Sequence, residues 1–326
     1  MIYIETGSTD IFYNLSAERY FAAQKKPGDT AFLLWRTTPT LVVGKYQNTL
    51  EEIRRDYAEA QGIQVARRLS GGGTVYADLG GWMFTFIEPD GAEEIQFQKY
   101  TRPIVDALRA LDVPADFNGR NDLMIDGRKF SGNSQYKLAG STVHHGTLMF
   151  DVDIERMVAA TSVADEKIIS KSIRSVRERV TNISEHLKAP MDAEAFKRHL
   201  LRFVMGEDSA RYELTDEDRA EIERFAREKL ATWEWNYGMN PKFSIGRAGR
   251  FAGGRIEFRL DVKKGLIAAA AMNGDFFAGE KADELTEALI GCRYERRAVR
   301  ERLFERGFDG AIYGIGIDDI AATIAD

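Results

Sequence analysis

Three successive glycines separate an arginine pair from a β-prone run in the segment Arg67-Arg68-Leu69-Ser70-Gly71-Gly72-Gly73-Thr74-Val75-Tyr76. Glycine adopts backbone conformations that are closed to other residues, and it lets the main chain approach a ligand with no Cβ in the way. The exposed amides of such a loop can form a nest for an anion, to which Arg67 or Arg68 can add a charge-assisted contact. Taken alone, three glycines are more typical of a tight turn between two strands. The rest of the chain therefore has to decide between a turn and a phosphate site.

Composition limits the classes of protein to consider. The chain has 326 residues, a formal net charge of −6 and one cysteine, Cys292. This length predicts about two domains. The acidic balance gives no reason to expect nucleic acid or an anionic membrane as a partner. The N-terminus has no secretory signal, and there is no run of about 18 apolar residues. We therefore expect a cytoplasmic protein that binds neither nucleic acid nor membrane.

Apolar periodicity predicts an α/β fold of the α+β type, with a mixed-sheet catalytic domain over residues 1–240. Helices are expected at Phe12–Gln24, Ile104–Leu111, Phe196–Phe203 and Ile222–Leu230. Strands are expected at Ala31–Trp35, Thr40–Val43, Ile63–Val65, Trp82–Ile87 and Val143–Phe150. The first two of these strands are separated by Pro39 and are predicted to pair as a hairpin. These elements predict a sheet flanked by helices.

The C-terminal part of the chain has a pattern of its own. Trp233–Pro241 is predicted to end the large domain and to form a linker. A small α+β accessory domain is expected over residues 247–326. It has an alternating strand from Ile256 to Val262, a turn at Lys263–Gly265, and later helices. No chemistry is evident in this region.

Asp126-Gly127 lies between two apolar runs and predicts a two-residue hairpin turn. In this register Met124 faces Lys129 and Asp122 faces Ser131. The side chains of Asp122, Lys129 and Ser131 would then project from one face of the hairpin. Taken alone, this patch reads more readily as a solvated ion pair than as a functional site.

Two further segments leave alternatives open. His144 and His145 are adjacent in a predicted strand, so their side chains point to opposite faces. This is poor spacing for a zinc site, although one of them can hydrogen-bond in a pocket. The segment Ser170–Thr181 has four basic residues against one acidic residue. It is either a solvated helix face or a loop that holds an anion.

Five motifs together carry a resemblance to a known family. They are Arg67–Tyr76, Gly119–Asp122, Lys129–Gly132, His144–Thr147 and Ser175–Asn182. In these motifs, and in their order and spacing, the chain resembles the lipoate-protein ligases. The resemblance implies an α/β catalytic domain, shared with biotin ligases and octanoyl transferases, and an accessory C-terminal domain. It implies an ATP-dependent enzyme that activates (R)-lipoate with MgATP to lipoyl-adenylate and pyrophosphate.

In the second step that the resemblance implies, the lipoyl group passes to a lysine of a carrier domain. The carriers it implies are the E2 subunit of 2-oxoacid dehydrogenases and the glycine cleavage H protein. An apolar tunnel for the lipoyl chain is expected along the strand Trp82–Ile87. The basic segment Ser170–Thr181 resembles a loop that closes over the adenylate.

The resemblance also implies roles for single residues. Lys129 is the implied catalytic residue, in contact with the lipoyl carboxylate and the α-phosphate. Ligand contacts are implied for Arg68, Gly71, Gly72, Gly73, Thr74, Val75, Tyr76, Asn121, Asp122, Lys129, Ser131 and His145. No metal ligand is assigned, and Asp122 is the candidate for contact with Mg²⁺.

The chain departs from the family pattern at two positions. Ala77 stands where the family commonly has histidine, and Thr74 stands where alanine is usual. Three other functions are compared with the ligase. An octanoyl transferase would need a cysteine near the motifs, but Cys292 is far away in sequence. A biotin ligase would need an activation loop rich in arginine and glycine, which is not seen. Only Ala77 favours a non-catalytic paralogue that binds the carrier.

Overall fold

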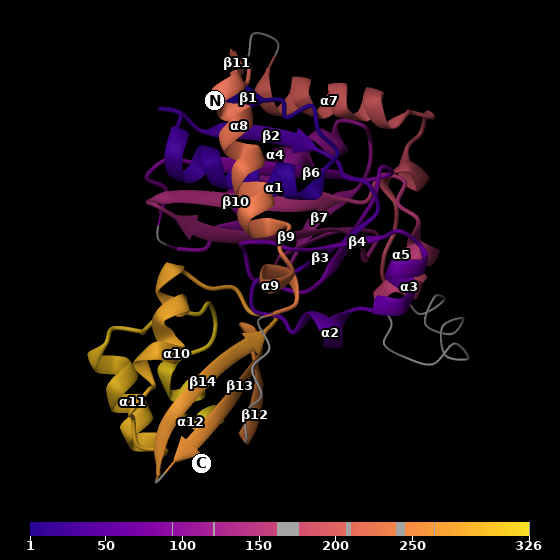
Figure 1. Ribbon diagram of the computed structural model, residues 1–326. Helices are drawn as coiled ribbons and strands as arrows, with labels where there is room; N and C mark the ends of the chain where they lie inside the picture. Colours follow the sequence, from indigo (N-terminus) through magenta and orange to yellow (C-terminus); the bar gives the residue numbers. More distant parts are fainter. Residues whose placement is uncertain are drawn as a thin grey trace.

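Eight strands assemble into one mixed sheet, in the order β11-β1-β2-β6-β10-β9-β8-β7 (Figure 1). In this order they span Ala210–Tyr212, Ile2–Ile4, Ala31–Trp35, Trp82–Glu88, Ser141–Leu148, Arg128–Leu138, Asp122–Ile125 and Ala115–Asn118. The computed structural model describes residues 1–92, 94–119, 121–161, 176–206, 210–238, 245–263 and 265–325. Half of the basic segment Ser170–Thr181, namely residues 170–175, lies outside the described residues. The predicted fold class is confirmed.

Helices cover both faces of this sheet. One face packs on α4 (Phe97–Arg109) and α7 (Ala193–Met205), and the core there includes Phe84 and Phe86 of β6. The other face packs on α1 (Ile11–Tyr20) and α8 (Asp216–Phe225), which lie in front of the sheet in Figure 1. Alternate residues of β6 thus enter two different cores, because successive side chains of a strand point to opposite faces.

A second, three-stranded sheet carries the glycine segment. Its order is β4-β3-β5, with strands Gln64–Arg67, Thr40–Val43 and Val75–Ala77. The predicted hairpin of Ala31–Trp35 with Thr40–Val43 is therefore wrong, because β2 pairs with β1 and β6 whereas β3 pairs with β4 and β5. Both strands are buried along their whole length, so each needs a partner on either side. Long-range pairing overrides the local turn signal. The short helices α2 (Thr49–Glu52), α3 (Arg55–Ala60) and α5 (Ile154–Thr161) lie beyond this sheet.

The hairpin at Asp126-Gly127 is confirmed, but its register changes halfway. Ile125 pairs with Arg128 and Met124 pairs with Lys129, as predicted. A β-bulge then shifts the pairing, so that Asp122 lies opposite Gly132 and not opposite Ser131. A bulge reverses the alternation of side chains beyond it. Ser131 is therefore removed from the face that carries Lys129, and it is fully buried.

The C-terminal region forms a separate core of its own. Strands β12 (Ile245–Phe251), β13 (Gly254–Lys263) and β14 (Leu266–Gly274) pack against α10 (Leu285–Ala288), α11 (Arg296–Glu305) and α12 (Ile317–Ile324). Figure 1 shows this unit set apart from the large sheet. The segment Trp233–Pro241, predicted to end the large domain and form a linker, begins with helix α9 (Trp233–Asn236), whose carbonyls accept hydrogen bonds from Arg67 of the large domain. No helix within the described residues has both the length and the apolar character needed to cross a bilayer.

Candidate active site

The loop of residues 68–74, called the glycine loop here, connects β4 to β5. Its conformation is held by the side chain of Arg68. The Arg68 guanidinium is buried and donates to the carbonyl oxygens of Val42, Gly71 and Gly73 at 2.7–2.9 Å. Its Nε also donates to Ser70 Oγ at 3.0 Å. Burial, together with the neighbouring Arg67 charge, lowers the pKa of Arg68 to about 10. Arg68 therefore fixes the direction of two loop carbonyls, and with them the direction of the loop amides.

Arg67 is a structural clamp: its side chain joins two segments of the chain and is not available to bind phosphate. Only 1% of its surface is exposed, and burial lowers its pKa to about 10. Its nitrogens donate to acceptors on two segments: the carbonyls of Gly44, Lys45, Gln47, Trp235 and Asn236 and the hydroxyl of Thr49. A guanidinium has five N–H donors, so these contacts use all of them. The suggested phosphate contact from Arg67 does not fit this arrangement.

Arg67→Lys is expected to lower the free energy of unfolding by about 2 kcal/mol, because a lysine ammonium cannot reach all these acceptors and leaves buried carbonyls unpaired. Denaturant unfolding monitored by circular dichroism measures the loss. Arg55→Lys is the matched control, since Arg55 forms an exposed ion pair with Glu59 at 2.7 Å. Equal free energies of unfolding for Arg67→Lys and Arg55→Lys would contradict the role of Arg67 as a clamp.

The glycines of the loop also allow close packing against the C-terminal unit. Gly72 N donates to Phe276 O at 2.9 Å, and a Cβ on Gly71 would lie 2.1 Å from the same oxygen. Gly72 has φ +90°, and a Cβ there would meet Phe277 Cε1 at 2.8 Å. At Gly71 and Gly72, the close approach that was expected of a ligand is therefore made by Phe276 and Phe277 of the C-terminal unit. The C-terminal region, in which no chemistry was evident, reaches the site directly.

A cleft of about 100 Å³ lies on the open side of the loop. Eight residues expected to contact ligand line it: Arg68, Gly72, Gly73, Thr74, Val75, Asn121, Lys129 and His145. The remaining lining residues are Met83, Gly132, Asn133, Ser134, Gly146, Thr147 and Phe277. Met83 is the one residue of the predicted tunnel strand among them. Phe277 comes from the C-terminal unit, and its sequence context gives no signal of a role in a distant cleft.

Lys129 is fixed at the edge of this cleft by its backbone. Its N–H donates to Arg179 O at 2.8 Å and its carbonyl accepts from Thr181 N at 2.9 Å. The ammonium contacts Asp122 Oδ1 at 2.8 Å, as the hairpin register predicted, and both side chains are about one-third exposed. A Cβ on Gly132 would lie 3.1 Å from Lys129 Nζ, so this glycine leaves room for the ammonium. The position of the cation is thus set before any ligand binds.

Asp122, the candidate for contact with Mg²⁺, pairs with Lys129 at the edge of the cleft but is not among the residues that line it. No group of three or more histidine, cysteine or acidic residues suited to a metal occurs among the described residues. Mg²⁺ commonly takes one or two carboxylates and fills its remaining positions with substrate phosphates and water. One carboxylate beside Lys129 fits a metal that arrives with ATP.

The other predicted ligand contacts lie outside the cleft lining. Ser131 is buried and its Oγ accepts from Asn133 Nδ2 at 3.2 Å. Tyr76 is buried among apolar residues such as Leu41 and Met149. Gly71 directs its carbonyl at Arg68 and Ser134. Their contact with a ligand stays a prediction.

His145 takes part in a buried hydrogen-bonded chain that also includes a residue missed in the sequence. Its Nε2 lies 2.6 Å from Ser70 Oγ, and its Nδ1 lies 2.9 Å from Glu18 Oε2. His144 points to the opposite face and stacks on Tyr100, as the alternation predicted. Glu18 lies on the buried face of α1 with Ile11 and Leu15. An acidic residue within an apolar helical stripe was the signal that could have identified it.

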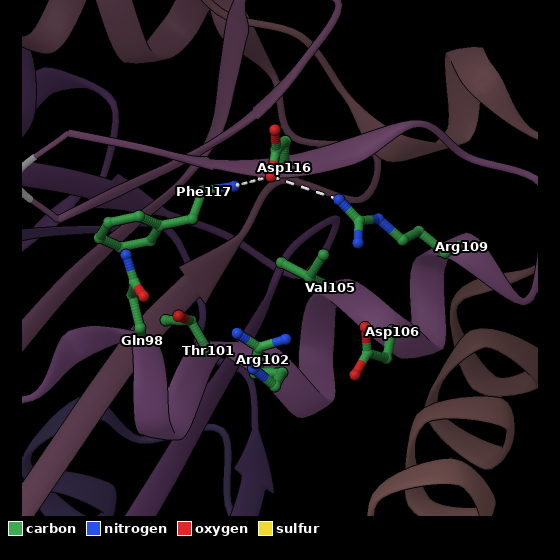
Figure 2. Close-up of a pocket in the computed structure, with 8 residues that line it drawn as sticks. All are labelled: Gln98, Thr101, Arg102, Val105, Asp106, Arg109, Asp116 and Phe117. Atoms are coloured by element: carbon green, nitrogen blue, oxygen red, sulfur yellow. Dashed lines mark hydrogen bonds and ion pairs between the residues drawn. The ribbon is translucent and has the colours of Figure 1, made fainter.

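A second hollow, of about 180 Å³, lies between α4 and β7 (Figure 2). Asp116 Oδ1 accepts there from Phe117 N at 2.9 Å and from Arg109 Nη2 at 3.3 Å. Two basic and two acidic side chains line it, so their charges balance: Arg102, Asp106, Arg109 and Asp116. It shares no lining residue with the cleft beside the glycine loop. The predicted site residues therefore point to the other cleft.

Comparison with known proteins identifies the family. Residues 10–204 match the family described as lipoyl protein ligase A/B catalytic domain, and residues 240–324 match bacterial lipoate protein ligase C-terminus. Lipoate-protein ligase LplJ of Bacillus subtilis is 41% identical over 309 residues, 93% of each chain. The P. falciparum LipL1 structure in complex with lipoate has a TM-score of 0.79, with 22% identity, and covers 93% of this chain and 94% of its own.

A structure of lipoate-protein ligase A bound with ATP has a TM-score of 0.61 and 23% identity, over 73% of this chain and 97% of its own. These two structures support the fold, whereas the family assignment depends on the sequence matches. The chain belongs to the lipoate-protein ligase family.

Proposed function

We propose that this chain activates lipoate with MgATP to lipoyl-adenylate and pyrophosphate, and then transfers the lipoyl group to a lysine of a lipoyl-carrier domain. The observation that carries the proposal is that Lys129 and the glycine loop line one cleft. Membership of the lipoate-protein ligase family supports it. The carriers proposed are the E2 subunit of 2-oxoacid dehydrogenases and the glycine cleavage H protein.

The first step forms a bond between a lipoate carboxylate oxygen and the α-phosphorus of ATP, while the bond to pyrophosphate breaks. Negative charge builds on the α-phosphate oxygens, where a fixed ammonium and main-chain amides stabilise it. Lys129 supplies the ammonium, and the loop held by Arg68 supplies the amides. Mg²⁺ bound to the phosphates would neutralise charge on the leaving pyrophosphate.

The second step forms an amide between the carrier lysine nitrogen and the acyl carbon, while the bond to the phosphate oxygen breaks and AMP leaves. No protein nucleophile is needed in either step, because positioning and electrostatics suffice. The twelve residues predicted to contact ligand, including Ser131, Tyr76 and Gly71, are proposed to take part in one ligand site. We also propose domain bounds of 1–240 and 247–326 and a cytoplasmic location.

Acid-dependent exchange of pyrophosphate into ATP tests this function, with lipoate, octanoate and biotin compared at equal concentrations. Exchange stimulated most by lipoate, followed by a mass increase of an apo lipoyl domain, is the expected result. Strong stimulation by biotin alone would favour a biotin ligase. Absence of exchange with all three acids would favour a carrier-binding paralogue.

Cys292→Ala is expected to leave both half-reactions within about twofold of the unchanged enzyme. Cys292 is buried in the C-terminal core, and burial raises the pKa of its thiol. A thiol of this kind is a poor nucleophile, because the thiolate is the reactive form. Carrier acylation is measured by mass spectrometry. Loss of acylation with normal adenylate formation would instead indicate a cysteine-dependent transferase.

A further inference from the structure

Four buried polar side chains form a continuous hydrogen-bonded chain from α1 to the glycine loop. Glu18 on α1 meets His145 Nδ1 at 2.9 Å, and His145 on β10 meets Ser70 Oγ at 2.6 Å. Ser70 in turn accepts from Arg68 Nε at 3.0 Å. None of the four has more than 5% of its surface exposed. The chain thus connects the wall of the cleft to the loop through the protein interior.

The order of donors in this chain follows from what each group can do. Arg68 Nε carries a hydrogen and can only donate, so Ser70 Oγ accepts from it. The Ser70 hydroxyl hydrogen is then free to be donated to His145 Nε2. An accepting Nε2 places the imidazole hydrogen on Nδ1, which points at the Glu18 carboxylate. Every member of the chain is satisfied by this single assignment.

The second carboxylate oxygen of Glu18 is also held. Glu18 Oε1 accepts from the Thr85 hydroxyl at 2.5 Å, and Thr85 Oγ1 accepts from Trp35 Nε1 at 3.2 Å. The acid is therefore anchored to two strands of the large sheet, β6 and β2. Because the Glu18 side chain is held in one position, the hydrogen-bonded chain starts from a fixed point.

At its other end the chain acts on the glycine loop. Arg68 donates to the carbonyls of Gly71 and Gly73, and so holds the two peptide groups that follow them. The Gly72 amide is taken by Phe276 O, whereas Gly73 and Thr74 line the cleft. Buried charges and polar groups of this kind contribute little net stability, and apolar side chains of similar volume often serve as well or better. A polar network in which every member is hydrogen-bonded instead holds its side chains in one geometry.

We propose that Glu18, His145 and Ser70 are positioning residues that act through Arg68 to set the glycine-loop amides for the phosphates of ATP. The inference rests on the proposed function, and it assigns different roles to different residues of the site. Lys129 is the catalytic residue, whereas these three residues affect binding of the nucleotide. Their effect on binding of the acyl acid is expected to be small, except at His145, which itself lines the cleft.

Calorimetric titration of the full-length enzyme with MgATP and, separately, with lipoate tests this inference. Ser70→Ala removes one hydroxyl and is expected to weaken MgATP binding on the order of tenfold, as the loss of one hydrogen bond to a charged group does. The Kd for lipoate is expected to change less than twofold. Glu18→Gln retains the shape of the side chain and is expected to produce the same selective loss.

Ser16→Ala is the matched control, since Ser16 lies on α1, is fully buried, and has a hydroxyl with no hydrogen-bond partner among the described residues. It is expected to leave both Kd values unchanged. In the double variant Ser70→Ala/Glu18→Gln, the loss of MgATP affinity is expected to be smaller than the product of the two single losses, because one chain is cut twice.

Three outcomes would overturn the positioning role. They are unchanged MgATP affinity in Ser70→Ala, equal weakening of MgATP and lipoate in both single variants, and strictly multiplicative losses in the double variant. Failure of the proposed function is a different result, because the unchanged enzyme would then bind neither MgATP nor lipoate. Thermal unfolding of each variant shows whether a loss of affinity comes from a loss of fold.

Discussion

Lys129→Ala is expected to slow formation of lipoyl-adenylate on the order of 10²-fold or more, as removal of a preorganised charge donor does at comparable sites. The hydrogen bonds of its backbone to residues 179 and 181 and the contact with Asp122 hold the ammonium at the cleft before ligand arrives. Deletion of the side chain therefore removes an interaction that needs no rearrangement to act. Single-turnover pyrophosphate release with lipoate and MgATP measures the effect.

Lys129→Arg is expected to recover little of this loss, because a planar guanidinium does not replace a compact ammonium between a carboxylate and a phosphate. Lys188→Ala is the matched control, since Lys188 is 73% exposed and forms a surface ion pair with Asp112 at 2.9 Å. Its rate should not change. Recovery of full activity by arginine would show that only positive charge matters at this position.

Gly72→Val is expected to abolish pyrophosphate exchange while the secondary structure is retained. Gly72 has φ +90°, a conformation that a β-branched residue adopts only with strain. Its Cβ would lie 2.8 Å from Phe277 Cε1 and 3.0 Å from Arg68 Nη2. The loop would have to change conformation, and the proposed phosphate site would be lost. Exchange assays and far-ultraviolet circular dichroism on the same sample separate the two effects.

Gly28→Ala is the control for Gly72→Val. A Cβ at Gly28 meets no atom within 4 Å, and its φ is not in the positive range. This variant should retain the activity of the unchanged enzyme. Near-normal exchange in Gly72→Val would mean that the glycine segment serves only as a turn.

The sequence predicted those parts of the fold in which local signals agree with one another. The buried strand Trp82–Ile87 and the turn at Asp126-Gly127 are present as predicted. The hairpin of Ala31–Trp35 with Thr40–Val43 failed, because strand partners are chosen by burial over the whole sheet. The β-bulge beyond Met124 was also not predicted, because one extra residue in a strand does not change its composition recognisably.

In the site, motifs identified the loop and Lys129 but not the support beneath them. Arg67 looked like a ligand contact, yet its acceptors lie on segments that are brought together only by folding. Phe277 is separated from the loop by about 200 residues of sequence, and its approach depends on how the C-terminal unit packs. Glu18 was missed as well, although a charge on an apolar helix face can be recognised from the sequence.

The two buried arginines, Arg67 and Arg68, give the proposed phosphate site a particular response to ionic strength. The groups that contact Arg67 are carbonyl and hydroxyl oxygens, which leave its positive charge uncancelled, and Glu18 reaches Arg68 only through His145 and Ser70. Salt screens exposed charges over a Debye length of about 8 Å at physiological concentration, but it screens buried charges much less. An enzyme with a net charge of −6 can therefore attract a polyanionic nucleotide locally, and this attraction should persist in salt concentrations that weaken surface-charge binding.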